Sequence, residues 1–405
     1  MSNVFNWQSA MSFVIFEAIQ NFMAETVKDP PATASSSTGL RGVVVGASTV
    51  SDVVGDKGQL IYQGYDIHDL AKHSNFEEVA FLLWNKRLPK QSELDQLKRE
   101  IGDSYHVPNE VIEVLRHTPT DADPTDVLRT AVSALEFYDP KARDISLESS
   151  RRTAIKLTAQ FPTLVATADR LRRGLEPVEP LSNESIATNF LYMLKGEMPS
   201  AEDAKLFDVC LILHADHELN ASTFTARVVA GTLASVYASV VAAIGALSGP
   251  LHGGANTNVM RTLLEIGELD RVESFLKAAL ASKRKIMGFG HAVYKTEDPR
   301  ATHLRQFSKE TGERAGDTKW YEMSRKLEEL MMREKGLYPN VDFYSASTYY
   351  MMGIPLDLYT PIFAVSRITG WTAHILEQYA DNKLIRPRAD YVGPRNVQYL
   401  PIEQR

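Results

Sequence analysis

One segment of the chain, Lys285–Arg300 (KIMGFGHAVYKTEDPR), combines a histidine with an arginine. A Gly-Phe-Gly motif precedes His291, and Arg300 follows nine residues later, after Asp298-Pro299. A histidine donates a proton or a hydrogen bond near neutral pH. An arginine binds a carboxylate through two parallel hydrogen bonds. The segment therefore predicts a site that binds an anionic carbonyl compound and polarises its carbonyl group.

A second segment, residues 213–223 (LHADHELNAST), carries two histidines. His214 and His217 are spaced like metal ligands, but the HExxH motif of zinc hydrolases does not occur in the sequence. The favoured interpretation makes His214 a structural histidine and His217 a ligand-binding one. Asn220 and Ser222 then orient a neighbouring group by hydrogen bonds. A metal site is the alternative.

A third histidine, His252, lies in residues 248–260 (SGPLHGGANTNVM). A Gly-Pro pair precedes it and a Gly-Gly pair follows it, so turn chemistry restricts the backbone on both sides. A lone histidine in a loop is more often unremarkable. The flanking glycines and proline favour a functional role for this one.

Residues 340–394 supply a carboxylate and further arginines. Asp342 stands between apolar residues, and partial loss of water would make its carboxylate a stronger base. Arg367 interrupts an apolar helical pattern, and a buried arginine requires an anion. Arg386 and Arg388 add two more cationic candidates near the end of the chain.

Basic residues also surround the Gly-Phe-Gly motif, namely Lys283, Arg284, Lys285 and Lys295. They could bind phosphate groups, and the alternative for each lysine is an exposed, solvated position. Gly288 and Gly290 leave their backbone groups open to a ligand. The motif is not GxGxxG and follows no strand–helix pattern, so NAD binding is not indicated.

The composition is that of a globular protein of 405 residues, with 44% hydrophobic residues and a net charge of −7. This charge argues against a broad face that binds nucleic acid, so clustered arginines must bind any anionic ligand. The single cysteine, Cys210, excludes an intrachain disulfide and a cysteine metal cluster. Its apolar surroundings predict a place in the core, with a nucleophilic role as the weaker alternative.

Residues 1–38 read as an extension ahead of the folded chain. No Lys or Arg precedes Lys28, so neither a secretory signal nor a transit peptide fits, and we expect a cytoplasmic protein. Asp29–Thr38 (DPPATASSST) is typical of a disordered linker, and Met23 is an alternative translation start.

The elements that must position these residues are mostly helical. The runs GVVVGAST (42–49) and QLIYQG (59–64), separated by turn residues, predict a small N-terminal β hairpin. Apolar residues at helical spacing predict helices over Phe76–Trp84, Ser92–Ile101, Asp126–Phe137, Arg151–Arg172 and Ser185–Leu194, with a further start at Ser200. Breaks are predicted at Pro89, Pro124, Pro162, Pro180 and Pro199.

Residues 228–249 form a long uncharged stretch that is rich in Ala, Ser and Gly. Its composition and the lack of a basic flank favour a buried helix or a helix–helix contact over a membrane span. A more charged, amphipathic region begins near Met260. We therefore predict a two-lobed fold, with a large helical domain of residues 39–258 and 361–405 and a small helical domain of residues 259–360.

These segments, in this order, resemble the citrate synthase family from Gly39 to about Pro394, and GFGHAVYKTEDPR, NVDFYSAS and RITGWTAHILEQ resemble its short bacterial form. The resemblance implies a mostly α, two-lobed fold that closes on oxaloacetate before acetyl-CoA binds. It implies condensation of these substrates to citrate and CoA in a homodimer with shared active sites, with neither a metal nor a tightly bound cofactor. Because the strand-rich N-terminal region of the NADH-inhibited form is missing, we expect a simple dimer without NADH control.

The resemblance also assigns roles to residues. Asp342 matches the base that deprotonates the acetyl methyl group, His252 the group that hydrogen-bonds the thioester oxygen, and His291 the acid that polarises the oxaloacetate carbonyl. Arg300, Arg367 and Arg386 match carboxylate-binding arginines, and Arg386 is expected to reach the partner subunit's site. His217 matches a further contact to oxaloacetate, and Asn220 and Ser222 match residues around the histidines. The residues matched to CoA binding are Lys285, Ile286, Met287, Gly288, Phe289, Gly290 and Lys295.

Two other functions compete with this interpretation. A 2-methylcitrate synthase uses propionyl-CoA and shares all the catalytic residues, and a difference of one methylene is worth only about 1–3 kcal/mol in a pocket. The ending IRPRADYVGP favours citrate synthase. A non-catalytic helical binding protein is disfavoured because Asp342, His252 and His291 are all present.

Overall fold

The computed structural model describes residues 39–40 and 42–405. Residues Ser48–Arg386 form one compact unit that contains the helices α2 to α17 and the sheet. The described part of the other unit consists of residues 39–40, 42–47 and 387–405. The predicted extension over residues 1–38 lies outside the described residues, and so does the alternative start at Met23.

The predicted hairpin is present, but its first strand begins later than expected. The antiparallel sheet consists of β1 (Ser51–Val54), β2 (Gln59–Tyr62) and β3 (Tyr65–Asp66), with Val53 paired to Leu60. The prediction of a strand over 42–49 was wrong, because residues 43–45 are exposed and pair with no strand. In β1 the alternate residues Ser51 and Val53 are buried, as the two-residue period of a strand requires.

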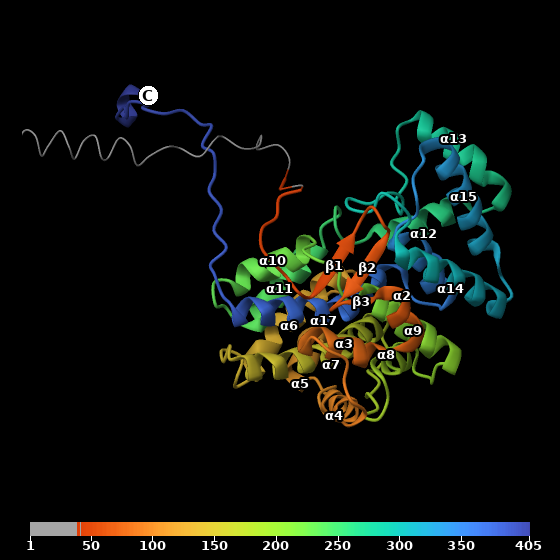
Figure 1. Cartoon of the computed structure of the whole chain (residues 1–405), viewed down its shortest axis with the longest axis horizontal. Helices are drawn as coiled ribbons and strands as arrows, with labels where there is room; N and C mark the ends of the chain where they lie inside the picture. The colour runs from red at the N-terminus through yellow and green to blue at the C-terminus, as the bar shows by residue number, and fades with distance from the viewer. Residues whose placement is uncertain (1–38, 41) are drawn as a thin grey trace, which may run out of the picture. The chain divides into compact units, whose positions relative to one another are not determined.

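Helices make up most of the described chain (Figure 1). The first ones are α2 (Ile67–His73), α3 (Phe76–Asn85), α4 (Gln91–Gly102), α5 (Asn109–Arg116), α6 (Pro124–Leu135), α7 (Leu147–Arg172), α8 (Ile186–Lys195) and α9 (Ala201–His214). They are followed by α10 (Ala221–Ala230), α11 (Val236–Leu247), α12 (Ala255–Ile266), α13 (Val272–Ala281), α14 (Pro299–Ala315), α15 (Lys319–Lys335), α16 (Val341–Met351) and α17 (Tyr359–Ala380). The mostly α fold class is confirmed.

Local signals explain several helix ends. Ser200 caps α9 by accepting a hydrogen bond from the backbone N–H of Asp203, as its position before an acidic turn predicted. Pro124 occupies the first turn of α6, where its missing N–H costs little. The predicted break at Pro162 was wrong, because α7 continues through this proline. Burial of α7 against α6, α8 and α17 offsets the lost helical hydrogen bond.

The core is built around α17, which packs against α3, α7, α9, α10 and α11. Trp371 and Arg367 are among its fully buried side chains. The uncharged stretch 228–249 is divided between α10 and α11, which pack against each other. In the described part of the chain, no helix has both the length and the apolar character needed to cross a membrane.

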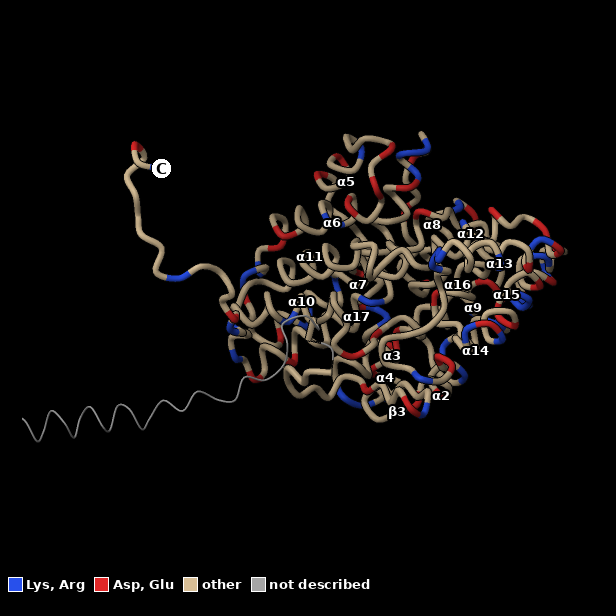
Figure 2. The backbone as a smooth tube through the Cα atoms, turned by 90° about the horizontal axis from the view of Figure 1, so that it is seen from above, with Lys and Arg blue, Asp and Glu red and all other residues tan. Residues whose placement is uncertain are grey.

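Helices α12 to α16 pack against one another on one side of this unit, away from α3 to α8 (Figure 1). Basic and acidic residues alternate along α14 and α15, as expected for amphipathic helices with one solvated face (Figure 2). This grouping is consistent with the predicted small domain, residues 259–360, whose boundaries stay a prediction. The junctions between α12–α16 and the other helices carry the residues of the candidate site.

Candidate active site

His291 is held as a neutral hydrogen-bond donor. Its Nδ1 accepts hydrogen bonds from the backbone N–H groups of Val293 (3.0 Å) and Tyr294 (3.1 Å). A neutral imidazole whose Nδ1 is an acceptor carries its proton on Nε2. Burial, and then the positive charge of Arg300, lower the pKa of His291 to about 4. At neutral pH this side chain can therefore donate a hydrogen bond from Nε2.

His217 and Tyr294 complete a cluster of three rings with His291. The ring centroids lie 5.1 Å apart for His217 and His291, and 4.7 Å apart for His291 and Tyr294. The Nε2 atom of His217 is 3.3 Å from the Tyr294 hydroxyl. Burial and the charge of Arg300 bring the pKa of His217 well below its usual value, so it too is neutral. The structure thus brings together two histidines that are far apart in sequence.

The small sheet supports the loops that carry both histidines. The Tyr62 hydroxyl donates to the backbone oxygen of Asp216 (2.8 Å) and accepts from its N–H (3.1 Å), next to His217. At the tip of the hairpin, the oxygen of Gly55 accepts a hydrogen bond from the N–H of Lys295 (3.1 Å). The hairpin therefore contributes to the relative placement of the two histidine loops.

Arg300 is already oriented by a buried carboxylate. Its Nε and Nη2 donate to Asp298 Oδ1 (2.9 Å) and Oδ2 (2.8 Å). Burial would raise the pKa of Asp298, but the charge of Arg300 outweighs this and keeps the pKa below its usual value. Asp298 Oδ2 also accepts from the N–H of Val341 (3.1 Å), at the start of α16. Asp298 thus connects Arg300 to the helix that carries Asp342.

Sequence reasoning did not single out Asp298 as a functional residue. The available signal was its place before Pro299, because an aspartate before a proline in a first helical turn is a typical N-cap. Tyr294 was missed too, and no pattern in its surroundings marks it.

Arg367 is buried, and part of its guanidinium group has no hydrogen-bond partner among the residues that the structure describes. Its Nε donates to the backbone oxygen of His214 (2.8 Å), and its Cζ lies 4.6 Å from the ring centroid of Phe363. Its Nη2 atom is buried without a hydrogen-bond partner among the described residues. Burial lowers the pKa of Arg367 to about 10, which still leaves it charged at neutral pH. An unpaired buried cation of this kind requires an anionic ligand.

Asp342 is the carboxylate best suited to act as a base. It lies in the first turn of α16, where its N–H donates to the side chain of Asn340 (3.1 Å). Burial raises the pKa of Asp342 to about 6, with Arg300 opposing the shift and Asp298 adding to it. A carboxylate with a raised pKa is a stronger base, and it is still ionised at pH 7.

His252 contacts Ser222 at the start of α10. The Nε2 atom of His252 lies 2.8 Å from the Ser222 hydroxyl oxygen, which is also 2.7 Å from Oδ1 of Asn220. Asn220 caps α10 by accepting from the N–H of Thr223 (3.1 Å). Burial, and then the charge of Arg367, lower the pKa of His252 to about 4. The predicted role of Asn220 and Ser222 as residues around a histidine agrees with these contacts.

The charges of Arg300 and Arg367 influence the predicted catalytic groups. Arg300 shifts the pKa values of His217, His291 and Asp342. Arg367 shifts those of His217, Asp342 and His252. Each predicted catalytic group therefore lies within the electrostatic influence of at least one of the two arginines. Arg386 differs, because it is exposed beyond the end of α17.

The Gly-Phe-Gly segment is packed more tightly than its glycines predicted. Gly288 has a φ of +85°, and a Cβ there would lie 2.6 Å from Val259 Cγ2 and 2.9 Å from Phe343 Cδ2. The Gly288 oxygen and the Gly290 N–H already bond to the backbone of residues 338–340. These groups are thus engaged within the protein, contrary to the expectation of open backbone groups.

The residues assigned to CoA differ in exposure. Ile286, Gly288 and Phe289 are buried, Met287 and Gly290 are half-buried, and Lys285 and Lys295 are exposed. The ammonium of Lys295 lies 2.7 Å from Asp56 in the hairpin turn, and both side chains are about three-quarters exposed. Such an exposed pair contributes little and leaves Lys295 available to another anion. The assignment to CoA stays a prediction.

His214 is buried, and its Nδ1 lies 2.7 Å from the backbone oxygen of Cys210. This contact supports its structural interpretation, although its Nε2 is without a hydrogen-bond partner among the described residues. Within residues 39–40 and 42–405, no group of three or more His, Cys, Asp or Glu side chains is arranged to hold a metal ion. Cys210 is fully buried, as predicted.

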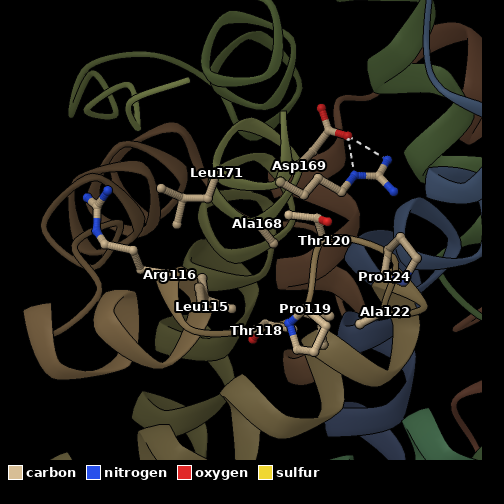
Figure 3. A pocket seen from close by; sticks show the side chains of 12 residues that line it. Leu115, Arg116, Thr118, Pro119, Thr120, Ala122, Pro124, Ala168, Asp169 and Leu171 are labelled. Carbon is tan, nitrogen blue, oxygen red and sulfur yellow. Dashed lines mark hydrogen bonds and ion pairs between the residues drawn. The ribbon is translucent and has the colours of Figure 1, made fainter. Parts of the chain in front are cut away.

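A separate cavity lies between the α5–α6 connection and α7 (Figure 3). Asp169 and Leu171 line it from α7, and Pro119 lines it from the α5–α6 connection. None of the predicted site residues lines this cavity. Asp169 is paired with Arg172, so its carboxylate already has a cationic partner.

Comparison with known proteins agrees with this geometry. The family model described as "Citrate synthase, C-terminal domain" matches residues 39–388. The chain is 53% identical over 372 residues to Citrate synthase 2 of Bacillus subtilis (strain 168), covering 92% of this chain and 100% of the relative. It is 42% identical over 360 residues to Citrate/2-methylcitrate synthase of the same strain, covering 89% and 97%.

A solved structure shares the fold. It is the ternary complex of carboxymethyl coenzyme A and oxaloacetate with citrate synthase from Thermoplasma acidophilum. The TM-score is 0.87 at 33% sequence identity, over 92% of this chain and 100% of that chain. From the extent of the family match and these identities, the chain belongs to the citrate synthase family.

Proposed function

We propose that the protein condenses oxaloacetate with acetyl-CoA and hydrolyses the citryl thioester to citrate and CoA. The observation that carries this proposal is the charge arrangement around Asp342. A carboxylate with a pKa of about 6 lies within the electrostatic influence of two buried arginines. This combination pairs a base for a weakly acidic methyl group with cations for a dicarboxylate. The names of the relatives and the ligands of the Thermoplasma complex support the choice of substrates.

Oxaloacetate is bound by the arginines and the histidine cluster. The Nη2 of Arg367 donates a hydrogen bond to one carboxylate of oxaloacetate. Arg300, which Asp298 orients, binds the second carboxylate. His291 donates from Nε2 to the ketone oxygen, and neutral His217 adds a hydrogen bond without adding positive charge. Polarisation of the ketone makes its carbon a better electrophile.

The acetyl group is activated by Asp342 and His252. Asp342 removes a proton from the methyl group while His252 donates a hydrogen bond to the thioester oxygen, where negative charge develops. Donors aimed at such an oxygen typically stabilise the transition state by about 3–4 kcal/mol each. The resulting enol carbon attacks the ketone carbon, and the ketone oxygen, which gains the electron pair of the C=O bond, takes the Nε2 proton of His291 and becomes a hydroxyl group. Water then hydrolyses the thioester and releases CoA.

Closure of the small domain on oxaloacetate protects the enol from water. Lys285–Gly290 and Lys295 form the CoA-binding segment in this proposal. The cytoplasmic location, the lack of a tightly bound cofactor and the lack of NADH control stay predictions from the sequence.

The proposal includes a homodimer in which Arg386 serves the partner's site. Arg386 is exposed after the end of α17, so it is available to an adjacent subunit. An Arg386→Ala variant is expected to lose oxaloacetate affinity. When it is mixed with an Asp342→Asn variant, each mixed dimer regains one complete site, because intact Asp342 and intact Arg386 meet there. Statistical mixing restores about a quarter of the sites.

Turnover of such mixtures, refolded together and assayed for CoA release, measures this complementation. Arg388→Ala is the matched control, since Arg388 is exposed two residues further along the chain. It should neither reduce oxaloacetate affinity nor require complementation. Mixtures that stay as inactive as the separate variants would show that Arg386 acts within its own subunit.

The second candidate function is 2-methylcitrate synthesis, which is favoured by the relative named for both reactions. Because identity to that relative is 42% and identity to Citrate synthase 2 is 53%, we propose acetyl-CoA as the preferred substrate. The deciding experiment compares kcat/KM for acetyl-CoA and propionyl-CoA at saturating oxaloacetate. We expect acetyl-CoA to be favoured by about 10-fold or more, the value of one methylene in a pocket. A preference for propionyl-CoA would overturn the assignment.

A further inference from the structure

We propose that Trp371 is a positioning residue for His252 and acts through the hydroxyl group of Ser222. The inference rests on the proposed function, because it concerns the group that hydrogen-bonds the thioester oxygen. Trp371 lies within α17 and is fully buried. Its indole Nε1–H donates to the Ser222 hydroxyl oxygen at 3.0 Å. The same oxygen lies 2.8 Å from Nε2 of His252.

The Ser222 hydroxyl lies within hydrogen-bonding distance of three polar side-chain atoms. A hydroxyl donates one hydrogen bond and accepts two. Its three partners are Trp371 Nε1 at 3.0 Å, His252 Nε2 at 2.8 Å and Asn220 Oδ1 at 2.7 Å. An indole N–H can only donate, so Trp371 always occupies one of the two lone pairs. Asn220 Oδ1 can only accept, so it competes with His252 Nε2 for the single hydroxyl proton.

The proton of Ser222 therefore governs the tautomer of His252. If the hydroxyl donates to Nε2, the ring proton resides on Nδ1 and points away from Ser222. If it donates to Asn220, Nε2 carries the proton and donates to Ser222. The backbone N–H of Ser222 also lies 3.3 Å from Nε2, which favours the form in which Nε2 accepts. That form leaves Nδ1–H free to donate to a thioester oxygen.

Removal of the indole N–H changes this balance without opening a large cavity. In a Trp371→Phe variant, the Ser222 hydroxyl has a free lone pair and gains rotational freedom, so its orientation toward His252 is no longer determined. Misplacement of a catalytic group by about 1 Å can cost about 100-fold in rate. We expect kcat to fall by about 10- to 100-fold. Oxaloacetate affinity should be unchanged, because Trp371 contacts neither Arg300 nor His291 in the hydrogen-bond network.

The chain provides a matched control for this substitution. Trp84 is also buried, and its Nε1 donates to a hydroxyl, that of Thr372, at 2.9 Å. Trp84→Phe removes the same kind of hydrogen bond from the same core. It should cost similar stability while leaving kcat and the state of His252 unchanged. Comparison of the two variants separates a loss of packing from a loss of positioning.

The experiment measures kcat, KM for acetyl-CoA, oxaloacetate affinity and thermal stability for both variants. It also records the ring ¹⁵N signals of His252 in labelled protein without substrates, assigned by their disappearance in His252→Gln. We expect the His252 signals and kcat to change in Trp371→Phe and to stay as in the wild type in Trp84→Phe. Unchanged His252 signals in Trp371→Phe, or equal losses of kcat in the two variants, would overturn the proposal.

A double substitution tests the path through Ser222. In a Ser222→Ala background, Trp371→Phe should reduce kcat no further, because the hydroxyl that connects the two rings is gone. Additive losses would show that Trp371 acts by another route. If the wild-type protein released no CoA, the proposed function would fail on its own, whereas the ring signals of His252 would still test the role of Trp371.

Discussion

Replacement of Asp342 by asparagine is expected to reduce kcat by about 10²–10⁴-fold, the usual contribution of a positioned general base. The amide is nearly isosteric with the carboxylate but cannot accept the proton of the acetyl methyl group. Oxaloacetate should still bind, because Arg300, Arg367 and His291 are unchanged. CoA release under saturating substrates measures the loss, and calorimetry with oxaloacetate alone measures the retained affinity.

The control for this substitution is Asp126→Asn. Asp126 also lies in the first turn of a helix, α6, but it is exposed and pairs with Arg129. The Asp126→Asn variant should have the same kcat as the wild type. Turnover by Asp342→Asn close to that of this control would refute the assignment of the base.

The pH dependence of the wild type provides an independent check. Because burial raises the pKa of Asp342 to about 6, the ionised base prevails only above that pH. The value of kcat/KM for acetyl-CoA should therefore increase as the pH rises through about 6 and then level off. Since the folded-state pKa is raised, ionisation of Asp342 also costs stability as the pH rises toward 6. Asp342→Asn should consequently have a higher melting temperature than the wild type at pH 7.

Replacement of Arg367 by methionine is expected to weaken oxaloacetate binding by about 2–5 kcal/mol, or roughly 30- to 5,000-fold. The reason is the loss of the buried cation whose Nη2 has no hydrogen-bond partner in the described part of the chain. Methionine keeps much of the packing volume beside Phe363. Without ligand, the variant should be as stable as the wild type or more stable, since it no longer buries an incompletely paired charge. Calorimetry and thermal unfolding measure both quantities.

The control for Arg367→Met is Arg172→Met, because Arg172, unlike Arg367, has carboxylate partners among the described residues. It pairs with Asp169 and Asp357, so its charge is already compensated within the protein. Arg172→Met should lower the melting temperature and leave oxaloacetate affinity unchanged. If Arg367→Met behaved like this control, Arg367 would be a structural residue rather than a ligand for the dicarboxylate.

Much of the fold follows from local patterns in the sequence. The helices predicted over Phe76–Trp84 and Ser185–Leu194 agree with α3 and α8 within a residue or two at each end. Capping at Ser200 and the helix start at Pro124 are likewise local effects. They depend on side chains within one helical turn, so neighbouring residues are sufficient to predict them.

The errors arose where distant packing outweighs a local preference. The run of valines at residues 43–45 favours a strand, yet β1 forms at Ser51–Val54, where alternate side chains reach the core. Pro162 favours a break, yet α7 continues because its neighbours bury it on several sides. Both outcomes depend on contacts that a window of sequence does not contain.

In the candidate site, too, some properties follow from the local sequence and others from distant contacts. Residue types and their neighbours were enough to identify His252, His291, Asp342 and the buried Arg367 as candidates. Their pKa values and tautomers depend on contacts between segments that are far apart in the chain. Asp342 becomes a stronger base because folding partly removes it from water, and His291 is a neutral Nε2 donor because two backbone N–H groups donate to its Nδ1. Such desolvation and hydrogen bonding exist only once the helices are packed. The sequence therefore determined the chemical identity of each group, whereas only the tertiary structure decided its pKa and tautomer.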